Sequence, residues 1–391
     1  MGLPPLVEAA EPPDGLDPAQ VRHHSRQIML PGFGLQAQRR LSAARVLVVG
    51  AGGLGSPVLL YLAAAGVGTL GLVEFDVVDA SNLQRQVVHR RADVGRPKSA
   101  SAADAVAALN PDVQVVRHEQ RLSADHALEL FARYDLVVDG ADNFPTRYLV
   151  NDAAALLGMP YVWGSVFGYD GQASVFWSGR GPTYRDLHPA PPAPGTVPSC
   201  AEGGVLGAVC GVIGSVMATE AVKLVTGLGE PLLGRMLVYD ALGMSFRTVS
   251  LRVNPRTAPV TGLVDYDDLC GTGTTGEVPA DRTVDVATLG AWLDQRRRGE
   301  RDFVLVDVRE PGEHEINRIP GSIVVPRAGL LAGDGWQDLP ARRPLVVCCK
   351  SGARSAEVVR AAMRSGRDDV VHVVGGVDAW ISRYDPAQPR Y

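Results

Sequence analysis

A short loop near residue 350 has the residue types of a sulfur-handling site. Cys349-Lys350-Ser351-Gly352-Ala353-Arg354 lies between an apolar run at 345–348 and a segment at 355–364 with helical character. A loop that leads into a helix turns backbone N–H groups inward, and such a nest lowers the pKa of a thiol and stabilises a thiolate or persulfide. Lys350 and Arg354 add positive charge. The sequence therefore predicts Cys349 as a nucleophile, with Arg354 as a catalytic cation beside it.

Cys348 is the competing nucleophile. Four residues separate Cys349 from Arg354, and five separate Cys348 from it, which is the spacing of cysteine-dependent phosphatases. The longer loop makes room for a phosphate, whereas the shorter one suits a single sulfur. Phosphatase loops usually carry His before the cysteine, and here the residue is Val347. Because Cys348 also completes an apolar strand, where cysteine is typically an inert core residue, the sequence favours Cys349.

A glycine loop in the first half of the chain has the residues of a phosphate site. Gly50-Ala51-Gly52-Gly53-Leu54-Gly55 follows a β-branched run at 45–49, and a helix at 54–65 and a strand at 69–74 come next. This order predicts parallel strands, with glycines that let backbone N–H groups and a helix dipole approach an anion. Most such loops bind NAD, FAD or similar dinucleotides. Glu74 ends the second strand where a ribose-binding acid is expected, which does not separate NAD from ATP.

The polar residues that follow favour a triphosphate over a dinucleotide. Ser81 to Gln86, Lys98 and Arg26 supply amides and cations beyond what a dinucleotide needs. Asp142, at the carboxyl end of a strand at 136–139, is placed to hold Mg²⁺. The sequence therefore predicts an ATP–Mg²⁺ site, with Asp142 as a catalytic residue. Its candidate binding residues are Gly50, Gly52, Gly53, Gly55, Glu74, Asp76, Ser81, Asn82, Arg85, Gln86, Lys98, Asp142, Asn143 and Arg26.

These motifs, together with Arg26-Gln27, resemble the ubiquitin-activating superfamily in its prokaryotic MoeB/ThiF branch, over about residues 17–265. The resemblance implies that ATP–Mg²⁺ meets the C-terminal Gly-Gly carboxylate of a small ubiquitin-like sulfur-carrier protein. The carboxylate attacks the α-phosphate and gives an acyl-adenylate and pyrophosphate. It also implies that Glu74 holds the ribose, that Lys98 and Arg85 hold the phosphates, and that Asp142 holds the metal. Arg26 would reach the γ-phosphate from the other protomer of a homodimer.

The chain departs from this family at its zinc ligands. Many members carry two Cys-x-x-Cys pairs, but here Thr183-Tyr184-Arg185-Asp186 stands at the first and residues 257–261 stand near the second. All four ligands are missing, so we expect no zinc. Cys200, in Pro198-Ser199-Cys200-Ala201-Glu202, lies where the family keeps a cysteine that attacks the activated acyl group or resolves an acyl disulfide. The resemblance thus makes Cys200 a catalytic candidate.

The C-terminal segment resembles a rhodanese domain over about 284–388. The motifs that carry the likeness, besides the cysteine loop, are Asp307 to Glu310, Ile319 to Ser322 and Gly375 to Trp380. The usual Gly-His before Ile-Pro-Gly is Asn317-Arg318, a position that is more structural than catalytic. The basic loop is similar to the thiosulfate-using kind, and the family implies a Cys349 persulfide. The whole chain thus resembles the MoeZ-type adenylyltransferase/sulfurtransferases, in which the persulfide attacks the adenylated carrier and leads to its thiocarboxylate.

Composition and segment boundaries complete these expectations. With 391 residues, 46% hydrophobic content and a net charge of -5, the chain fits two or three α/β domains and gives no reason to expect nucleic acid as partner. We expect a disordered tail at 1–16, a Rossmann-like adenylation domain at 17–265, a flexible linker at 266–283 and a smaller rhodanese domain at 284–391. A helix is expected at 17–29, with Asp17 as its N-cap and Pro18 as its first residue. A mobile loop is expected at 179–201 and a buried helix at 205–226.

The expected compartment is the cytoplasm. The N-terminus shows no basic segment followed by an apolar run, and no stretch of about 20 apolar residues is apparent. Five cysteines without disulfide-like spacing fit a reducing environment.

Two alternative functions stay open at this stage. One is an NAD-linked oxidoreductase with a sulfur-relay domain, and the segment Ser81 to Gln86 argues against it. The other is a non-catalytic adaptor for a ubiquitin-like protein, and Asp142, Lys98 and Cys349 argue against that.

Overall fold

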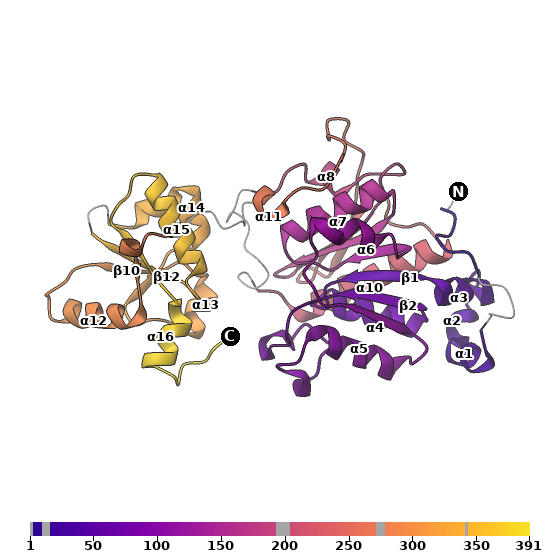
Figure 1. The fold of residues 1–391 in the computed structure, drawn as a ribbon, viewed down its shortest axis with the longest axis horizontal. Helices are drawn as coiled ribbons and strands as arrows, with labels where there is room; N and C mark the ends of the chain where they lie inside the picture. Colours follow the sequence, from indigo (N-terminus) through magenta and orange to yellow (C-terminus); the bar gives the residue numbers. More distant parts are fainter. Residues whose placement is uncertain (1–2, 10–15, 193–203, 271–277, 341–342) are drawn as a thin grey trace. The chain divides into compact units, whose positions relative to one another are not determined.

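The computed structural model describes residues 3–9, 16–192, 204–270, 278–340 and 343–391. These residues form two compact units, the first ending at Cys270 and the second taking the remainder of the chain. A short helix, α11 (Tyr266–Leu269), still belongs to the first unit, so ordered structure continues past the predicted domain end at 265 (Figure 1). Residues 271–277, within the predicted flexible linker at 266–283, lie outside the described residues.

The first unit is built on one eight-stranded sheet of order β3-β2-β1-β4-β5-β6-β7-β8. The pairs from β3 to β5 are parallel, and those from β5 to β8 are antiparallel. The predicted strands at 45–49 and 136–139 are confirmed at both ends, whereas β5 to β8 were not predicted. The strands are β1 (Arg45–Val49), β2 (Thr69–Val73), β3 (Gln114–His118), β4 (Leu136–Asp139), β5 (Tyr161–Phe167), β6 (Asp170–Phe176), β7 (Arg235–Asp240) and β8 (Ser245–Ser250).

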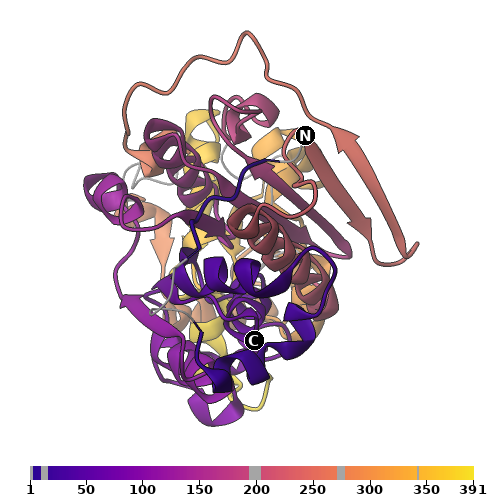
Figure 2. The same ribbon diagram turned by 90° about the vertical axis from the view of Figure 1, so that its right-hand side faces the viewer.

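Helices cover both faces of this sheet, because right-handed crossovers place successive helices on the two sides of a parallel sheet whose order reverses. Figure 1 shows α6 and α7 on one face and α4, α5 and α10 on the other. The β7–β8 hairpin forms the outer edge, and every residue of β8 is exposed (Figure 2). The helices are α4 (Gly55–Ala65), α5 (Lys98–Leu109), α6 (Ala124–Phe131), α7 (Phe144–Leu157), α8 (Tyr184–Leu187) and α10 (Gly207–Thr226), with 3₁₀ turns η1 (Ala80–Asn82) and η2 (Arg91–Asp93).

The expectation that no apolar stretch of membrane-spanning length exists is wrong. Helix α10 has 20 residues, and an 18-residue window within it has a mean hydropathy of 1.6, which suffice by length and composition to cross a bilayer. In this fold α10 is a core helix, with Ile213 and Met217 fully buried. Its apolar character therefore has a packing explanation, in agreement with the buried helix predicted at 205–226.

The N-terminal segment forms three short helices, α1 (Pro18–His23), α2 (Ser25–Ile28) and α3 (Gly34–Ala43). Asp17 caps α1 as predicted, since its carboxylate accepts the Gln20 N–H at 2.8 Å and Gln20 bonds back to the Asp17 N–H. The single helix predicted at 17–29 is broken at His24, whose φ of -92° and ψ of 8° leave the helical range.

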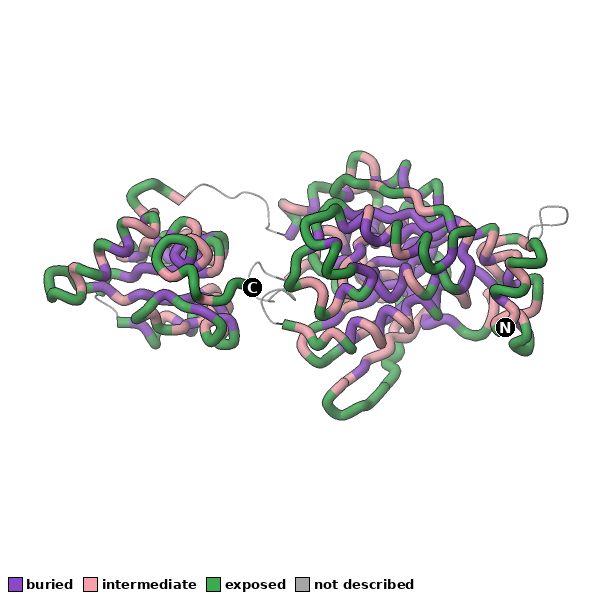
Figure 3. Tube along the Cα trace, turned by 90° about the horizontal axis from the view of Figure 1, so that it is seen from below, coloured by how far each residue is buried: buried purple, intermediate pink, exposed green. Residues whose placement is uncertain are grey.

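The second unit is a five-stranded parallel sheet of order β11-β10-β12-β13-β9. Two separate apolar cores cover its faces, and in Figure 3 the buried residues run through the centre of this unit. The strand predicted at 345–348 is confirmed at both ends. The elements are η3 (Ala280–Arg282), β9 (Thr283–Val284), α12 (Val286–Arg297), β10 (Val304–Asp307), α13 (Pro311–Ile316), β11 (Ser322–Val324), α14 (Arg327–Ala332), η4 (Asp334–Asp338), β12 (Leu345–Cys348), α15 (Ala353–Arg364), β13 (Val370–Val373) and α16 (Gly376–Tyr384).

Candidate adenylation and sulfur-transfer sites

The glycine loop lies between β1 and α4, at the point where the strand order reverses between β1 and β4. Gly50 has a φ of +90°, and its N–H donates to the Val73 carbonyl at 2.9 Å. A Cβ at Gly55 would lie 1.8 Å from the Gly50 carbonyl oxygen, so the loop turns back on itself more tightly than a side chain permits. No side chain caps α4. The Ser56 N–H already donates to the Gly52 carbonyl at 2.9 Å, and Pro57 has no N–H, so α4 offers an anion mainly the positive end of its dipole.

Arg85 and Gln86 lie against this loop, as predicted from their positions in the polar segment. A Cβ at Gly52 would be 3.7 Å from Gln86 Nε2, and one at Gly53 would be 3.6 Å from Arg85 Cγ and 2.8 Å from Cys210 Sγ. The two glycines thus admit side chains from elsewhere in the fold. This cradle fits a nucleotide phosphate, because glycines without side chains lie beside the Arg85 and Gln86 side chains and the start of α4.

Ser81 and Asn82 have a structural task in this fold. They form η1, in which Ser81 Oγ donates to Asp79 Oδ1 at 2.6 Å and Asn82 Oδ1 accepts the Asp79 N–H at 3.2 Å. Arg85 Nη1 donates to the Ser81 carbonyl at 3.1 Å. The turn at 80–82 therefore orients Arg85, and nucleotide contacts of Ser81 and Asn82 remain a prediction.

Glu74 joins the glycine loop to the end of β2. Its Oε2 accepts the Ala51 N–H, and its Oε1 accepts the N–H groups of Phe75 and Asp76, each at 2.9 Å. Lys98, at the start of α5, is buried, and its Nζ lies 3.1 Å from Asp76 Oδ2. The buried Lys98 stem thus places its ammonium group beside one exposed carboxylate, at the edge of the site.

His89 is a residue of this site that the sequence analysis missed. Its ring is buried, with Nε2 3.2 Å from the Ala51 carbonyl oxygen and Nδ1 2.9 Å from Ser101 Oγ. It therefore links the glycine loop to α5, the helix that begins with Lys98. Burial lowers the pKa of His89, which keeps the ring neutral. Its position three residues after the polar segment at 81–86 is the signal that could have identified it.

Asp142 and Asn143 follow β4 at the same edge of the sheet. Asn143 caps α7, since its Oδ1 accepts the Thr146 N–H at 3.0 Å. Asp142 is exposed, so its carboxylate oxygens are accessible to a Mg²⁺ ion that also binds phosphate. Asp139, at the end of β4, is fully buried, and its Oδ2 has no partner among the described residues. Burial raises the pKa of Asp139 to about 6.

Arg26 and Gln27 have different surroundings. Gln27 Nε2 donates to Gln38 Oε1 at 2.8 Å and to the Ala65 carbonyl at 3.1 Å, which ties α2 to α3 and α4. Arg26 lies exposed on α2. Its predicted contact with the γ-phosphate of another protomer stays a prediction.

The segments where the family carries zinc ligands meet through a carboxylate. Asp186 Oδ2 accepts the N–H and the Oγ1–H of Thr183 at 2.7 and 2.9 Å, and Asp186 Oδ1 accepts the Asn254 N–H at 2.9 Å. Burial opposes ionisation, but these hydrogen bonds outweigh it and lower the pKa of Asp186. One carboxylate among hydroxyls and amides does not fit zinc, which takes four sulfur or nitrogen ligands in structural sites.

The sulfur loop surrounds Cys349 with donors. The Gly352 N–H lies 3.1 Å from Cys349 Sγ, and Ser355 Oγ lies 3.6 Å from it. Gly352 has a φ of +102° and precedes α15, a 12-residue helix. Backbone donors and a helix N-terminus stabilise a thiolate. A Cβ at Gly376 would lie 2.2 Å from the Cys349 carbonyl oxygen, so Gly375-Gly376 packs directly against this loop.

Cys348 faces the other side of the sheet. It lies in the core beneath α12 and α16, whereas Cys349 lies in the core beneath α14 and α15. Burial, followed by the charge of Asp307, raises the pKa of Cys348 well above its ordinary value. The geometry therefore supports Cys349 as the nucleophile, as the loop spacing predicted.

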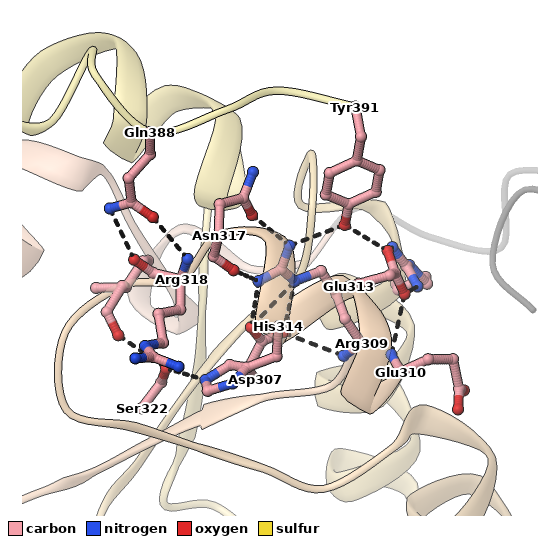
Figure 4. A network of polar contacts seen from close by, with 12 residues as sticks. Asp307, Arg309, Glu310, Glu313, His314, Asn317, Arg318, Ser322, Gln388 and Tyr391 are labelled. Atoms are coloured by element: carbon pink, nitrogen blue, oxygen red, sulfur yellow. Dashed lines mark hydrogen bonds and ion pairs between the residues drawn. The ribbon is translucent and has the colours of Figure 1, made fainter. Parts of the chain in front are cut away.

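The two cations of the loop are both paired. Arg354 donates two hydrogen bonds of 2.7 Å to the Glu313 carboxylate, and Lys350 Nζ bonds to the main-chain oxygen of Tyr391. Figure 4 shows Tyr391 beside Glu313 and Arg309. Neither Glu313 nor Tyr391 was predicted as a site residue. Predicted Cys200 lies outside the described residues.

A Rossmann-type phosphate site and a donor-lined cysteine loop in one chain define a nucleotide-dependent transferase with a sulfur-handling domain. The ThiF family model matches residues 24–259, and the rhodanese-like domain model matches residues 290–383. The chain belongs to the ThiF family and carries a rhodanese-like domain.

Known proteins with the same layout agree with this. The chain is 52% identical to "Probable adenylyltransferase/sulfurtransferase MoeZ" of Mycobacterium tuberculosis, covering 100% of this chain and 99% of the relative. It is 54% identical to "Sulfur carrier protein adenylyltransferase" of Thermus thermophilus, over 64% of this chain and 96% of the relative. A crystal structure of E. coli MccB matches with a TM-score of 0.55 at 20% identity, over 61% of this chain and 74% of that chain, which shows the fold alone. The chain is an adenylyltransferase and sulfurtransferase, and the oxidoreductase and adaptor alternatives are not favoured.

Proposed function

We propose that the first unit adenylates the C-terminal carboxylate of a small sulfur-carrier protein. The observation that carries the proposal is the convergence of the glycine loop, Arg85 and Lys98 at one edge of the sheet. A carboxylate oxygen of the carrier attacks the α-phosphorus of ATP, and the bond to pyrophosphate breaks. Lys98 and Arg85 offset the charge that moves onto the leaving oxygens, and the glycine loop and the positive end of the α4 dipole orient the phosphates.

Asp142 would hold Mg²⁺ in this site, where the ion neutralises phosphate charge. Its exposed carboxylate fits this, because Mg²⁺ commonly takes one or two protein carboxylates and fills its other positions with phosphate oxygens and water. Glu74 already bonds to three backbone N–H groups. A ribose hydroxyl would therefore share the Glu74 carboxylate with the glycine loop, which couples nucleotide binding to the shape of that loop.

The second unit then delivers sulfur. The Cys349 thiolate takes a sulfur atom from thiosulfate, releasing sulfite, or from another persulfide, releasing its thiolate. The terminal sulfur of the Cys349 persulfide attacks the acyl carbon of the adenylate, AMP leaves, and an acyl disulfide forms. A thiol, from Cys200 or from solution, attacks the Cys349 sulfur and releases the carrier thiocarboxylate. The disulfide left behind is reduced by a further thiol.

Assembly and location complete the proposal. A homodimer would let Arg26 of one protomer reach the γ-phosphate of its partner, and a cytoplasmic setting would keep the five cysteines reduced. The mass of the protein in solution, measured by light scattering, tests whether it forms a homodimer. A monomer that adenylates the carrier at full rate would contradict it.

One experiment tests the whole function. The chain is incubated with ATP, Mg²⁺, thiosulfate, a thiol reductant and each candidate carrier, and the carrier is examined by intact mass. The expected product has one carboxylate oxygen replaced by sulfur. Pyrophosphate release without this product would leave adenylation standing and overturn the sulfur step. Stabilisation by NAD but not by ATP in a thermal shift would contradict the adenylation step.

A further inference from the structure

Residues 385–391 cross the second unit as a strap that ends at the sulfur loop. Gln388 fastens its middle, since its Oε1 accepts the Arg318 N–H at 2.9 Å and its Nε2 donates to Asp385 Oδ2 at 2.7 Å. Asn317 Nδ2 donates to the Pro389 carbonyl at 2.7 Å. Asn317-Arg318 is the pair that departs from the rhodanese pattern. These residues therefore have a local task in holding the strap (Figure 4).

Tyr391 ends the strap and joins two charged groups through its phenol oxygen. The phenol O–H donates to Glu313 Oε1 at 2.6 Å, and Arg309 Nη1 donates to the phenol oxygen at 2.8 Å. Arg309 is itself fully buried and bonded to the Asp307 carboxylate at the end of β10. The phenol is thus fixed to the body of the sheet through an ion pair that water does not reach.

The same residue contacts both ends of the sulfur loop. At the start of the loop, Lys350 Nζ bonds to the Tyr391 main-chain oxygen and lies 4.4 Å from the centroid of the Tyr391 ring. At the end of the loop, Arg354 is bonded twice to Glu313, and one of the two carboxylate oxygens, Oε1, also accepts the Tyr391 phenol. Burial opposes ionisation of Glu313, but the bonds from Arg354, Tyr391 and the Glu310 N–H lower its pKa.

We propose that Tyr391 is a positioning residue for sulfur transfer, which fixes Lys350 directly and Arg354 through Glu313 and so sets the affinity of the Cys349 site for an anionic sulfur donor. A long lysine side chain has many rotamers, and an arginine fork can turn with its carboxylate partner. The strap removes this freedom before the donor arrives. Because the donor is a dianion such as thiosulfate, the direction of both cations affects binding more than it affects S–S cleavage.

This inference rests on the proposed function for its turnover assay. The Cys349 thiolate attacks the outer sulfur of thiosulfate, the S–S bond breaks, and sulfite leaves with the electron pair. Cyanide then attacks the terminal sulfur of the persulfide, thiocyanate leaves, and the thiolate is regenerated. The full chain is assayed for thiocyanate with Tyr391→Phe, which keeps the ring and the main-chain oxygen but removes both phenol hydrogen bonds.

The expected result is a split between the two kinetic constants. KM for thiosulfate rises about tenfold in Tyr391→Phe, the effect of losing hydrogen bonds to charged groups, whereas kcat stays within about twofold. Tyr384→Phe is the matched control, because Tyr384 lies on α16 in the same unit, where its ring packs at a tilt against Trp380 with 4.5 Å between the ring centroids. It should leave both constants unchanged. ATP–pyrophosphate exchange should not change in either variant.

A second readout does not depend on turnover. Iodoacetate and iodoacetamide alkylate the same thiolate, but only iodoacetate is an anion, so the ratio of their rates at Cys349 reports the positive charge directed at the sulfur. The ratio should fall in Tyr391→Phe, and less strongly in Gln388→Ala, which loosens the strap from its surface anchor. A merely structural role of Tyr391 would raise both alkylation rates equally.

A wild-type KM together with a wild-type alkylation ratio in Tyr391→Phe would overturn the inference. Absence of thiocyanate in the unaltered chain would contradict the proposed use of thiosulfate instead, while the alkylation ratio would still test Tyr391. The two failures are therefore distinguishable.

Discussion

Cys348 and Cys349 are adjacent in the chain but belong to two different hydrophobic cores, one on each face of the same sheet. Side chains of neighbouring strand residues point to opposite faces, and here the reversal coincides with the end of β12. Cys348 completes the strand, whereas Cys349 begins the loop and receives the Gly352 N–H. One residue of register therefore separates an inert thiol from a thiol among donors.

Replacing each cysteine should separate structure from chemistry. Cys349→Ala should abolish persulfide formation and thiocyanate release but retain ATP–pyrophosphate exchange with a carrier. Cys348→Ala should keep sulfur transfer and lose roughly 1 kcal/mol of stability, since it removes a buried sulfur. Intact mass after thiosulfate treatment and urea denaturation measure the two effects. A persulfide on Cys348 in the Cys349→Ala chain would contradict this assignment.

The glycine loop should tolerate no side chain at Gly55. A Cβ there would lie 1.8 Å from a backbone oxygen, so Gly55→Ala must displace the loop, and we expect adenylation to fall at least about 100-fold. Gly211→Ala in α10 is the control, because no atom beyond its chain neighbours and the surrounding helix backbone lies within 4 Å of its added Cβ. It should leave adenylation intact and stabilise the helix by up to about 1 kcal/mol. Pyrophosphate exchange in both variants measures this, and an active Gly55→Ala enzyme would refute the tight turn.

Asp186, rather than a metal ion, should hold the segment at 183–186 to the segment that contains Asn254. Asp186→Ala removes the acceptor of three hydrogen bonds and should lower stability by about 1–3 kcal/mol, whereas Asp186→Asn keeps one acceptor oxygen and should lose less. Thermal melts of the three proteins measure the order. Stoichiometric zinc in the unaltered chain, found by elemental analysis, would show that the link has another basis.

The buried Asp139 should make stability fall as pH rises from about 4 to 6. Its pKa is raised from 3.8 to about 6, so across this range the folded chain holds a proton that the unfolded chain has released. The difference corresponds to about 3 kcal/mol at most and is constant above the folded pKa. Asparagine at this position does not ionise. The stability of Asp139→Asn relative to the unaltered chain should therefore increase up to about pH 6 and stay constant above it. Urea midpoints at several pH values test this, and a pH-independent difference would contradict it.

Much of the fold followed from local patterns. The β-branched runs at 45–49, 136–139 and 345–348 became strands with both ends as predicted, because a continuous apolar run between turn residues suits a strand buried on both faces. The strands β5 to β8 escaped prediction. Gly164 and Gly171 interrupt two of them, and β8 is exposed along its whole length, so neither periodicity nor hydrophobicity marked them. The helix predicted at 17–29 failed at His24, where a buried ring and a broken turn have no strong local signal.

By itself, the sequence determined which chemistry this chain carries. The glycine spacing, the polar segment at 81–86 and the loop at 349–354 are local patterns, and their residue types set what they can bind. Tertiary structure decided which groups complete those sites. His89 reaches the Ala51 carbonyl across 38 positions, and Tyr391 reaches Glu313 across 78. Such pairs form only when strands and helices pack, because no local rule relates residues that meet solely through the arrangement of the whole sheet.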